Sequence, residues 1–412
     1  MKAIKKWKII LWGFVILLVF AAVTGIVLWQ NTDIPKLYLN GDISEMWDKG
    51  DVRTVSFTYD DRNQNISGFA EIKIQGTSSA NFVKKNYTLK FFEDEELEDK
   101  LKIDVGWGPQ NKYCMKANWI DRTHARNVVT AKLAAKMQAK YDLLTDAPNH
   151  GLIDGFPVEI YNNGRFLGLY TFNIPKDAWQ FAMDEDNPDH IVIGGEGWDP
   201  ANIFEAMPDF VTWEVEVGEE SEETLEKMNR LFDFVINSSD EEFKQNFEEY
   251  LNLDAALNYY VMTDIAWLYD NRGKNMLLAT YDGQQWYMSL YDLDTSWGTR
   301  HDGMGVMDYE DRLVNMHRSN LFRRMETAFS KELAERYFEL RKDILSNESI
   351  MAEFEAFRKD IPAVTFQKEI FRWTTGLFRT KDELPGSDYS QIQSYLQSVS
   401  DRLDAKYAAW LS

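Results

Sequence analysis

Four oxygen-bearing side chains stand near the two ends of one short stretch of the sequence. Asp270 and Asn275 lie five residues apart in a polar segment, and Asp292 and Asp294 follow an apolar run. Carboxylate and carboxamide oxygens are ligands that the hard cation Mg²⁺ accepts. Kinase-type phosphoryl transfer needs a carboxylate beside the accepting hydroxyl, and a carboxamide and a second carboxylate that hold the metal. The spacing therefore indicates Asp270 as the base or orienting carboxylate, with Asn275 and Asp292 as metal ligands and Asp294 as a further candidate.

The elements that must position these residues are a helix and a hairpin. Apolar periodicity predicts a helix over residues 253–267, just before Asp270. Two apolar runs then flank residues 281–284, and the Asp282-Gly283 pair there is a strong hairpin signal. Asp and Asn are also common turn formers, so the alternative that these residues only shape turns stays open.

A second candidate site lies in the first half of the chain. Residues 66–75 alternate like a half-buried strand, and Ser78 and Ser79 belong to the small-residue loop that follows. Backbone N–H groups and hydroxyls of such a loop can cradle phosphate, although an ordinary turn is the alternative. A second strand is expected from Lys85 to Phe92. Lys84 and Lys85 should point to opposite faces of it, so only one of them can enter a site.

Arg126 stands at the start of a predicted helix that ends near residue 138. A cation at this end opposes the helix dipole, and therefore favours a negative partner, either a phosphate or a buried carboxylate. The alternative is an exposed arginine with a small penalty. Asp121 is a candidate cap for the same helix, and His124 is expected at the surface.

Four blocks of sequence together resemble the CotH kinase family, the family of spore coat protein H. The matching stretches are Ile72–Ser79 with Val83–Tyr87, Met115–Asn127, Asn163–Tyr170, and Asp270–Asn275 with Tyr291–Gly298. The resemblance implies a secreted or surface atypical kinase that phosphorylates protein serines with ATP and Mg²⁺ or Mn²⁺. It also implies metal ligation by Asn275, Asp292 and Asp294, and nucleotide binding by Ser78, Ser79, Lys84 or Lys85, and Arg126.

Three positions depart from the family pattern. Gln75 stands where the family has arginine, Val83 where it has proline, and Asn173 where it usually has glutamate. These departures favour an alternative, a non-catalytic scaffold of the cell envelope or spore coat that keeps the fold. Aromatic residues near paired carboxylates suggest a third possibility, a glycan-processing enzyme.

The predicted fold class is α+β, an atypical protein-kinase-like domain of two lobes over residues 31–412. The strand-rich, nucleotide-binding part is expected at about 50–175. The helix-rich part with the metal motif is expected at about 220–412, and residues 184–220 are expected to be rich in loops.

Residues 1–30 read as a separate membrane unit. Lysines at positions 2, 5, 6 and 8 precede an uncharged apolar run of 21 residues, 9–29, which is long enough to span a bilayer. We therefore expect one transmembrane helix, or alternatively a cleaved signal, with residues 31–412 outside a bacterial cell.

Composition narrows the classes of partner. The net charge of −22 makes nucleic acid an unsuitable partner, because binding to a phosphate backbone needs basic surface. The expected partners are a protein substrate with serine residues and, through residues 1–30, the membrane. The single cysteine, Cys114, excludes an internal disulfide and should be a buried thiol.

Overall fold

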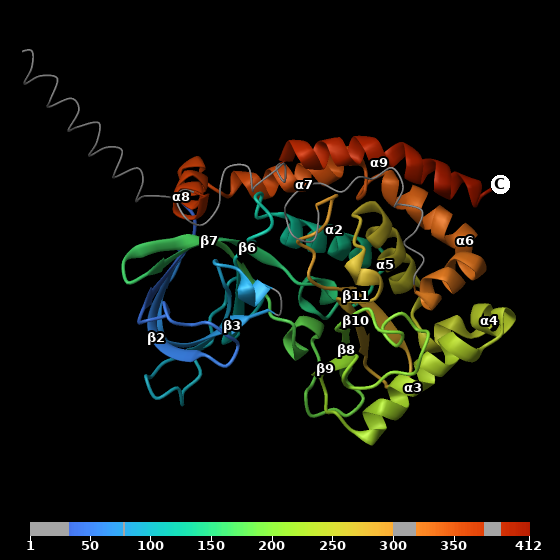
Figure 1. Ribbon diagram of the computed structural model, residues 1–412, viewed down its shortest axis with the longest axis horizontal. Coiled ribbons are helices and arrows are strands. Elements are labelled where there is room, and N and C mark those ends of the chain that lie inside the picture. The colour runs from blue at the N-terminus through green and yellow to red at the C-terminus, as the bar shows by residue number, and fades with distance from the viewer. Residues whose placement is uncertain (1–32, 77–78, 300–318, 375–388) are drawn as a thin grey trace, which may run out of the picture.

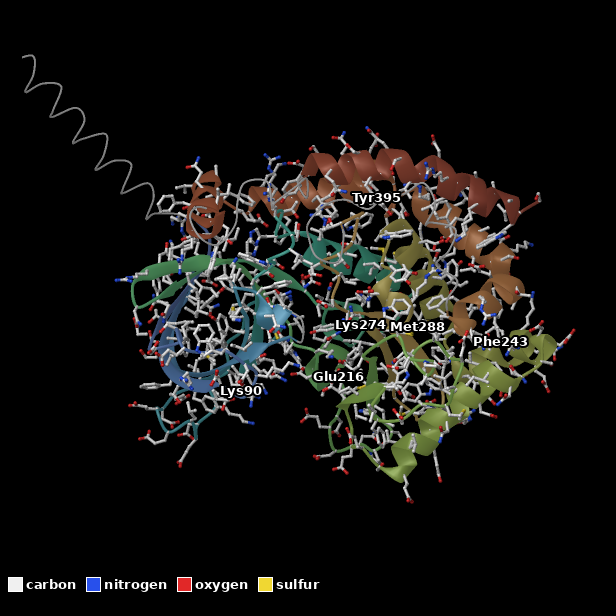
Figure 2. The ribbon with its side chains drawn as sticks, in the orientation of Figure 1. Lys90, Glu216, Phe243, Lys274, Met288 and Tyr395 are labelled. Carbon is white, nitrogen blue, oxygen red and sulfur yellow. The ribbon has the colours of Figure 1, made fainter. Side chains whose placement is uncertain are left out.

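Two β-sheets and a set of helices form the structure, a computed structural model that describes residues 33–76, 79–299, 319–374 and 389–412. The first sheet closes into a barrel, and most helices gather around the second sheet on the other side of the molecule (Figure 1). Figure 2 shows side chains filling both parts, with Lys90 on the barrel and Phe243 in the helical part.

Seven strands make the barrel, in the order β1-β2-β3-β4-β5-β7-β6. They are β1 (Lys36–Asn40), β2 (Val52–Asp60), β3 (Asn65–Gln75), β4 (Asn86–Phe92), β5 (Lys112–Lys116), β6 (Gly155–Asn162) and β7 (Arg165–Asn173). Alternate residues such as Val55, Phe57 and Tyr59 fill the interior. A parallel pairing of β1 with β6 closes the ring, which leaves no open strand edge.

The second sheet has four strands in the order β11-β10-β8-β9. They are β8 (Ile191–Gly195), β9 (Trp213–Val217), β10 (Met276–Thr280) and β11 (Trp286–Leu290). The expected hairpin at Asp282-Gly283 is confirmed, since β10 and β11 pair antiparallel. The expectation that residues 184–220 are mainly loop missed β8 and β9, which are only five residues long. Strand β8 pairs with β10, and β9 pairs with β8 at the edge of the sheet.

The two-lobed α+β prediction is therefore corrected. The structure is mixed α/β, with a closed seven-stranded barrel and a four-stranded sheet that joins the expected β10–β11 hairpin to β8 and β9. The helices are α2 (Arg126–Lys140), α3 (Glu222–Asn237), α4 (Asp240–Tyr250), α5 (Leu253–Ile265), α6 (Asn320–Arg341), α7 (Asn347–Lys359), α8 (Ala363–Thr374) and α9 (Tyr389–Ala409).

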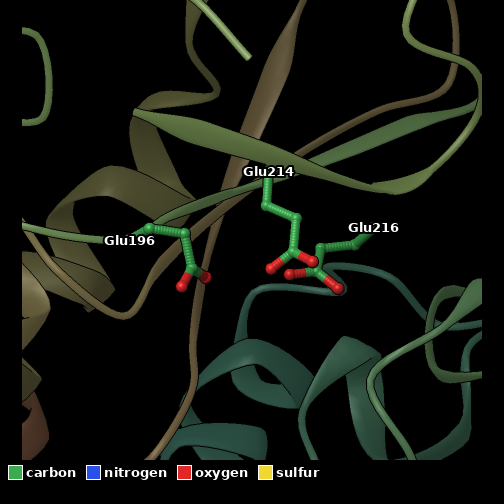
Figure 3. Close-up of side chains that lie close together, drawn as sticks. All are labelled: Glu196, Glu214 and Glu216. Carbon is green, nitrogen blue, oxygen red and sulfur yellow. The ribbon is translucent and has the colours of Figure 1, made fainter. Parts of the chain in front are cut away.

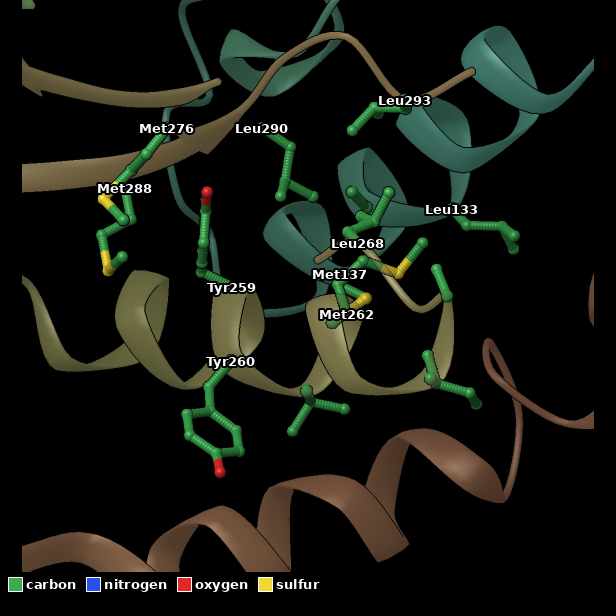
Figure 4. Packing of buried hydrophobic residues seen from close by; sticks show 14 of the residues in the cluster. Leu133, Met137, Tyr259, Tyr260, Met262, Leu268, Met276, Met288, Leu290 and Leu293 are labelled. Carbon is green, nitrogen blue, oxygen red and sulfur yellow. The ribbon is translucent and has the colours of Figure 1, made fainter. Parts of the chain in front are cut away.

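Helix α5 lies at the centre of the helical part. It is apolar on nearly every side and therefore fits only a fully buried position. Figure 4 shows Tyr259 and Met262 directed towards α2 and the β10–β11 hairpin, with Tyr260 directed to the opposite side. The short polar loop that carries Asp270 thus begins at the end of a rigid core helix.

No helix among the described residues is long and apolar enough to cross a bilayer. The prediction of a single-pass membrane protein is therefore corrected, because the described structure contains no such helix. The segment on which that prediction depended, residues 9–29, lies outside the described ranges.

Candidate functional site

Two loops meet where the barrel joins the helical part. One is the short 3-10 turn η4 (Asp270–Arg272), and the other follows β11. The Asn271 side-chain amide donates a hydrogen bond to the Tyr291 carbonyl at 2.7 Å and a second to the Asn275 carbonyl at 3.2 Å. The loop that carries Asp270 is thereby fixed against the turn that carries Asp292.

Left-handed backbone brings two of the expected ligands into these turns. Asn275 has φ 62° and Asp292 has φ 57°. Asn and Asp tolerate this conformation better than most residues, because their short polar side chains can bond locally. The Asn275 N–H donates to the Gly195 carbonyl at 2.9 Å, which ties the Asp270 loop to β8.

Carboxylates converge around Asp294. Burial raises the pKa of the Asp294 carboxyl well above its usual value, and the negative charges of Asp292, Asp121 and Asp270 raise it further. The opposing influence is the ammonium group of Lys116, at the end of β5. The Asp270 and Asp292 carboxylates are thus near enough to Asp294 to act on its charge, while the roles expected for all three stay predictions.

Lys116 lies in the Met115–Asn127 block that resembles the family, but no role was predicted for it from the sequence. Its Nζ lies 5.4 Å from the centre of the Tyr291 ring, directly before Asp292 in the chain. Burial lowers the pKa of Lys116, but Tyr291, Asp292 and Asp294 outweigh burial and the net pKa is raised. The signal that could have found it is the alternation of β5, which sends Tyr113 and Met115 into the barrel and Lys116 out of it.

The candidate ligands are more exposed than the residues that hold their loop in place. The candidate ligands and their cation are partly exposed, namely Lys116, Asp270, Asn275, Asp292 and Asp294. Asn271 and Arg272, which hold the loop, are each only 1% exposed. The first group thus keeps some exposed surface, whereas the second group belongs to the supporting core.

Lys84 lies away from this cluster and is buried. Its Nζ donates to the Ala117 and Leu169 carbonyls and, at 2.7 Å, to the Glu369 carboxylate of α8. All three donors of the ammonium group are therefore engaged. Lys85, partly exposed, donates to the Ala80 carbonyl at 2.5 Å.

The serine loop is described only in part. Ser78 lies outside the described residues. Ser79 begins the 3-10 turn η1 (Ser79–Asn81), and its hydroxyl oxygen accepts from the Asn86 side chain at 3.2 Å. The phosphate-binding role expected for both serines stays a prediction.

Arg126 has a buried carboxylate as its partner, one of the two partners that its position predicted. Its guanidinium forms an ion pair with Asp121, and its backbone N–H donates to the same carboxylate at 2.9 Å. Its Nε donates to the Ser296 carbonyl at 3.1 Å, just beyond Asp294. Arg126 is fully buried, so in this arrangement it supports the turn after β11.

Asp270 and Asp292 act electrostatically on Asp294, but the three carboxylates that lie within 4.8 Å of one another among the described residues are Glu196, Glu214 and Glu216. The negative charges around Asp294 raise its pKa even though the Lys116 ammonium group lies beside it. The aspartates together therefore carry more negative charge than Lys116 neutralises. Oxygen donors on two loops are the ligand set that Mg²⁺ or Mn²⁺ takes in nucleotide sites.

A separate acidic group lies on the second sheet. Carboxylate oxygens of Glu196, Glu214 and Glu216 lie within 4.8 Å of one another (Figure 3). Lys176 forms an ion pair with Glu216 and places its Nζ 4.6 Å from the centre of the Tyr291 ring. Two lysines, Lys116 and Lys176, therefore contact the residue that precedes Asp292.

The fold and the site define a mixed α/β protein whose acidic loops face a lysine where a barrel meets a helical part. Over residues 72–402 the sequence matches the family described as CotH kinase protein. The chain belongs to this family, as the sequence motifs predicted. A search of curated proteins found no match.

Proposed function

We propose that this protein is an ATP- and Mg²⁺- or Mn²⁺-dependent kinase that transfers the γ-phosphoryl group to serine hydroxyls of a protein substrate. The observation that carries the proposal is the convergence of Asp270, Asp292 and Asp294 from two loops that Asn271 joins. Membership of the CotH kinase family supports the same chemistry in its coarser form.

The residues divide into three roles. Asn275, Asp292 and Asp294 hold the divalent cation, which when bound neutralises phosphate charge. Lys116 faces the same carboxylates and is positioned to pair with a phosphate oxygen once the cation satisfies them. Asp270 orients the accepting hydroxyl and receives its proton as the general base.

A second candidate is a non-catalytic coat or envelope scaffold with the same fold. The observation that favours it is that two expected phosphate ligands, Lys84 and Arg126, are buried in ion pairs with Glu369 and Asp121. A scaffold that does not bind ATP would not require the Lys84 and Arg126 side chains to be available for phosphate. The partly exposed Lys116 answers part of this objection, because it leaves the proposed site with a lysine.

The test is transfer of labelled phosphate from γ-labelled ATP with Mg²⁺ or Mn²⁺ to serine, either in an added serine-rich polypeptide or in the protein itself. We expect transfer by the unchanged protein and its loss in Asp292→Asn, which preserves shape and tolerates the left-handed backbone. Absence of both transfer and stabilisation by ATP with metal would favour the scaffold.

A further inference from the structure

Helix α9 spans both loops of the candidate site from the outside. Near its start, the Gln391 side chain donates to the Trp297 carbonyl at 3.0 Å and accepts from Arg126. Trp297 lies three residues after Asp294, and its own N–H donates to the Ala266 carbonyl at the end of α5. The first turn of α9 is therefore bonded to the turn that carries the acidic pair.

The far end of α9 reaches the other loop through Asp264. One oxygen of this fully buried carboxylate accepts from Lys406 Nζ at 2.6 Å and from the Tyr407 hydroxyl at 2.8 Å. The other oxygen accepts from Arg272 at 2.6 Å. Arg272 lies two residues after Asp270, so a chain of charged hydrogen bonds links α9 to the loop of the proposed base.

The middle of α9 is held as well. The Tyr395 hydroxyl donates to the Ile265 carbonyl at 2.8 Å, at the last residue of α5, and Figure 2 places Tyr395 beneath α9. The helix thus contacts the end of α5 between the points where it meets the two loops.

Arg272, the arginine in this series of hydrogen bonds, is held in place by further contacts. Arg272 also donates to the Thr263 hydroxyl at 3.1 Å, and its guanidinium stacks 4.4 Å from the centre of the Tyr260 ring. Burial would raise the pKa of Asp264, but the charges of Lys406 and Arg272 outweigh it and hold the pKa below its usual value. These charged hydrogen bonds therefore fix the end of α9 relative to the backbone of residues 270–272.

We infer that α9 is the positioning element of the site, and that Tyr407 and Lys406 act through Asp264 and Arg272 to hold Asp270 at its working distance from Asp292. The inference rests on the proposed kinase function. It adds that residues more than 130 positions beyond Asp270 set the alignment of the proposed base, without touching substrate or nucleotide.

Two tyrosines on facing helices offer a matched pair of variants. The rings of Tyr337 and Tyr407 stack with centres 4.1 Å apart, and each hydroxyl donates to an aspartate, Asp404 for Tyr337 at 2.7 Å and Asp264 for Tyr407 at 2.8 Å. Tyr407→Phe and Tyr337→Phe each delete one hydroxyl from the same aromatic pair. The Tyr407 hydroxyl leads to Asp264, whereas the Tyr337 hydroxyl bonds Asp404 of α9.

We expect both variants to lower the melting temperature by similar amounts. Tyr407→Phe alone should lower kcat, by about tenfold, with the KM for ATP changed by less than about twofold, because misalignment of a reacting group affects turnover more than binding. The double variant Lys406→Met/Tyr407→Phe should enlarge the loss of kcat. Equal kcat in Tyr407→Phe and Tyr337→Phe, in a protein that does transfer phosphate, would overturn the inference and leave the proposed function standing.

Hydrogen exchange distinguishes failure of the positioning role of α9 from failure of the proposed kinase function. Amide exchange across residues 268–275 should rise in Tyr407→Phe and stay unchanged in Tyr337→Phe, whether or not the protein transfers phosphate. A rise confined to Tyr407→Phe in a protein without ATP turnover would refute the proposed function and keep α9 as the anchor of this loop. Equal exchange in the two variants would overturn the anchor itself.

Discussion

The Asn271 side chain donates a hydrogen bond to the backbone carbonyl of Tyr291 across 2.7 Å, and this bond joins the two halves of the candidate site. Asn271 follows the proposed base, and Tyr291 precedes a proposed metal ligand. The spacing of the proposed base and the proposed metal ligand therefore depends in part on this buried amide, which itself contacts neither nucleotide nor substrate in the proposed mechanism.

Replacement of Asn271 by alanine should reduce both stability and turnover. The carbonyls of Tyr291 and Asn275 would lose their donor in a partly buried place, and a cost of about 1 kcal/mol of unfolding free energy is expected, at the low end for such a loss. The control is Asn258→Ala, which removes a buried amide bonded to Gln138 and Arg336 near the other end of α5. Denaturant unfolding and ATP turnover should show similar destabilisation but a kinetic loss for Asn271→Ala alone. Equal turnover in the two variants would contradict the proposed role.

The roles of Asp270 and Asn275 should separate in kinetics. Asp270→Asn is expected to lower kcat by about 10²–10⁴-fold with ATP binding nearly unchanged, since a general base acts in the transition state. Asn275→Gly removes the carboxamide, while glycine keeps the left-handed backbone at φ 62°, and should weaken binding of ATP with Mg²⁺ as well. Calorimetric titration with ATP and Mg²⁺, beside turnover, decides the matter. Full turnover in Asp270→Asn would show that Asp270 only shapes the loop.

Two lysines of β5 test the assignment of Lys116. Lys116→Met should raise the KM for ATP and lower kcat, because the variant lacks a positive charge beside Asp292 and Asp294. Lys112→Met is the control, since Lys112 also points out of the barrel but forms an ion pair with Asp177 at 3.0 Å. Steady-state kinetics over a range of ATP concentrations should find only Lys116→Met impaired. Similar kinetics in both variants would remove Lys116 from the site.

Lys84 and Glu369 should prove to be structural partners. Lys84→Met alone leaves a buried carboxylate without its cation, and a loss of about 3–5 kcal/mol of unfolding free energy is expected for breaking such a pair. The double variant Lys84→Met/Glu369→Leu should be destabilised by less than the sum of the two single variants. Additive losses would argue that the ion pair contributes nothing. A specific rise of the KM for ATP in Lys84→Met would restore this lysine as a phosphate ligand.

His124 predicts a pH dependence of stability. The sequence suggested a surface position, but the side chain is 5% exposed, and burial followed by the positive charge of Lys84 lowers the pKa of His124 well below 6.5. The unfolded chain therefore binds a proton below pH 6.5 that the folded chain does not. Stability should consequently fall as the pH drops from 6.5 towards the folded pKa, by at most about 1.4 kcal/mol per pH unit.

The measurement for His124 is the unfolding free energy between pH 7.5 and 5.5. His124→Gln should flatten this dependence. His190→Gln is the control, because it also replaces a histidine, but one that is only partly buried and that lies in a different part of the fold. An unchanged slope in His124→Gln would contradict the assignment to His124.

The sequence by itself determined the local elements and the order of the acidic groups. Asp282-Gly283 forms the predicted hairpin turn, and Asn163-Gly164 forms another between β6 and β7, since such pairs tolerate the backbone that tight turns need. The run over Leu253–Ile265 is apolar enough to demand a buried helix, as found. Helix α8 begins at Ala363, directly after Pro362, and proline suits the start of a helix.

Only the tertiary structure decided which cations meet which carboxylates. Lys84 and Glu369 are 285 positions apart, and their ion pair exists because α8 packs on the outer face of β7. Lys116 faces the aspartates because the closed barrel turns that side of β5 towards the helical part. Alternation along a strand predicts whether a side chain points into or out of the barrel. It does not predict which element packs on the outer face of the barrel. Long-range packing supplies that information, because it pairs Lys84 and Arg126 with buried carboxylates and places Lys116 beside Asp292 and Asp294.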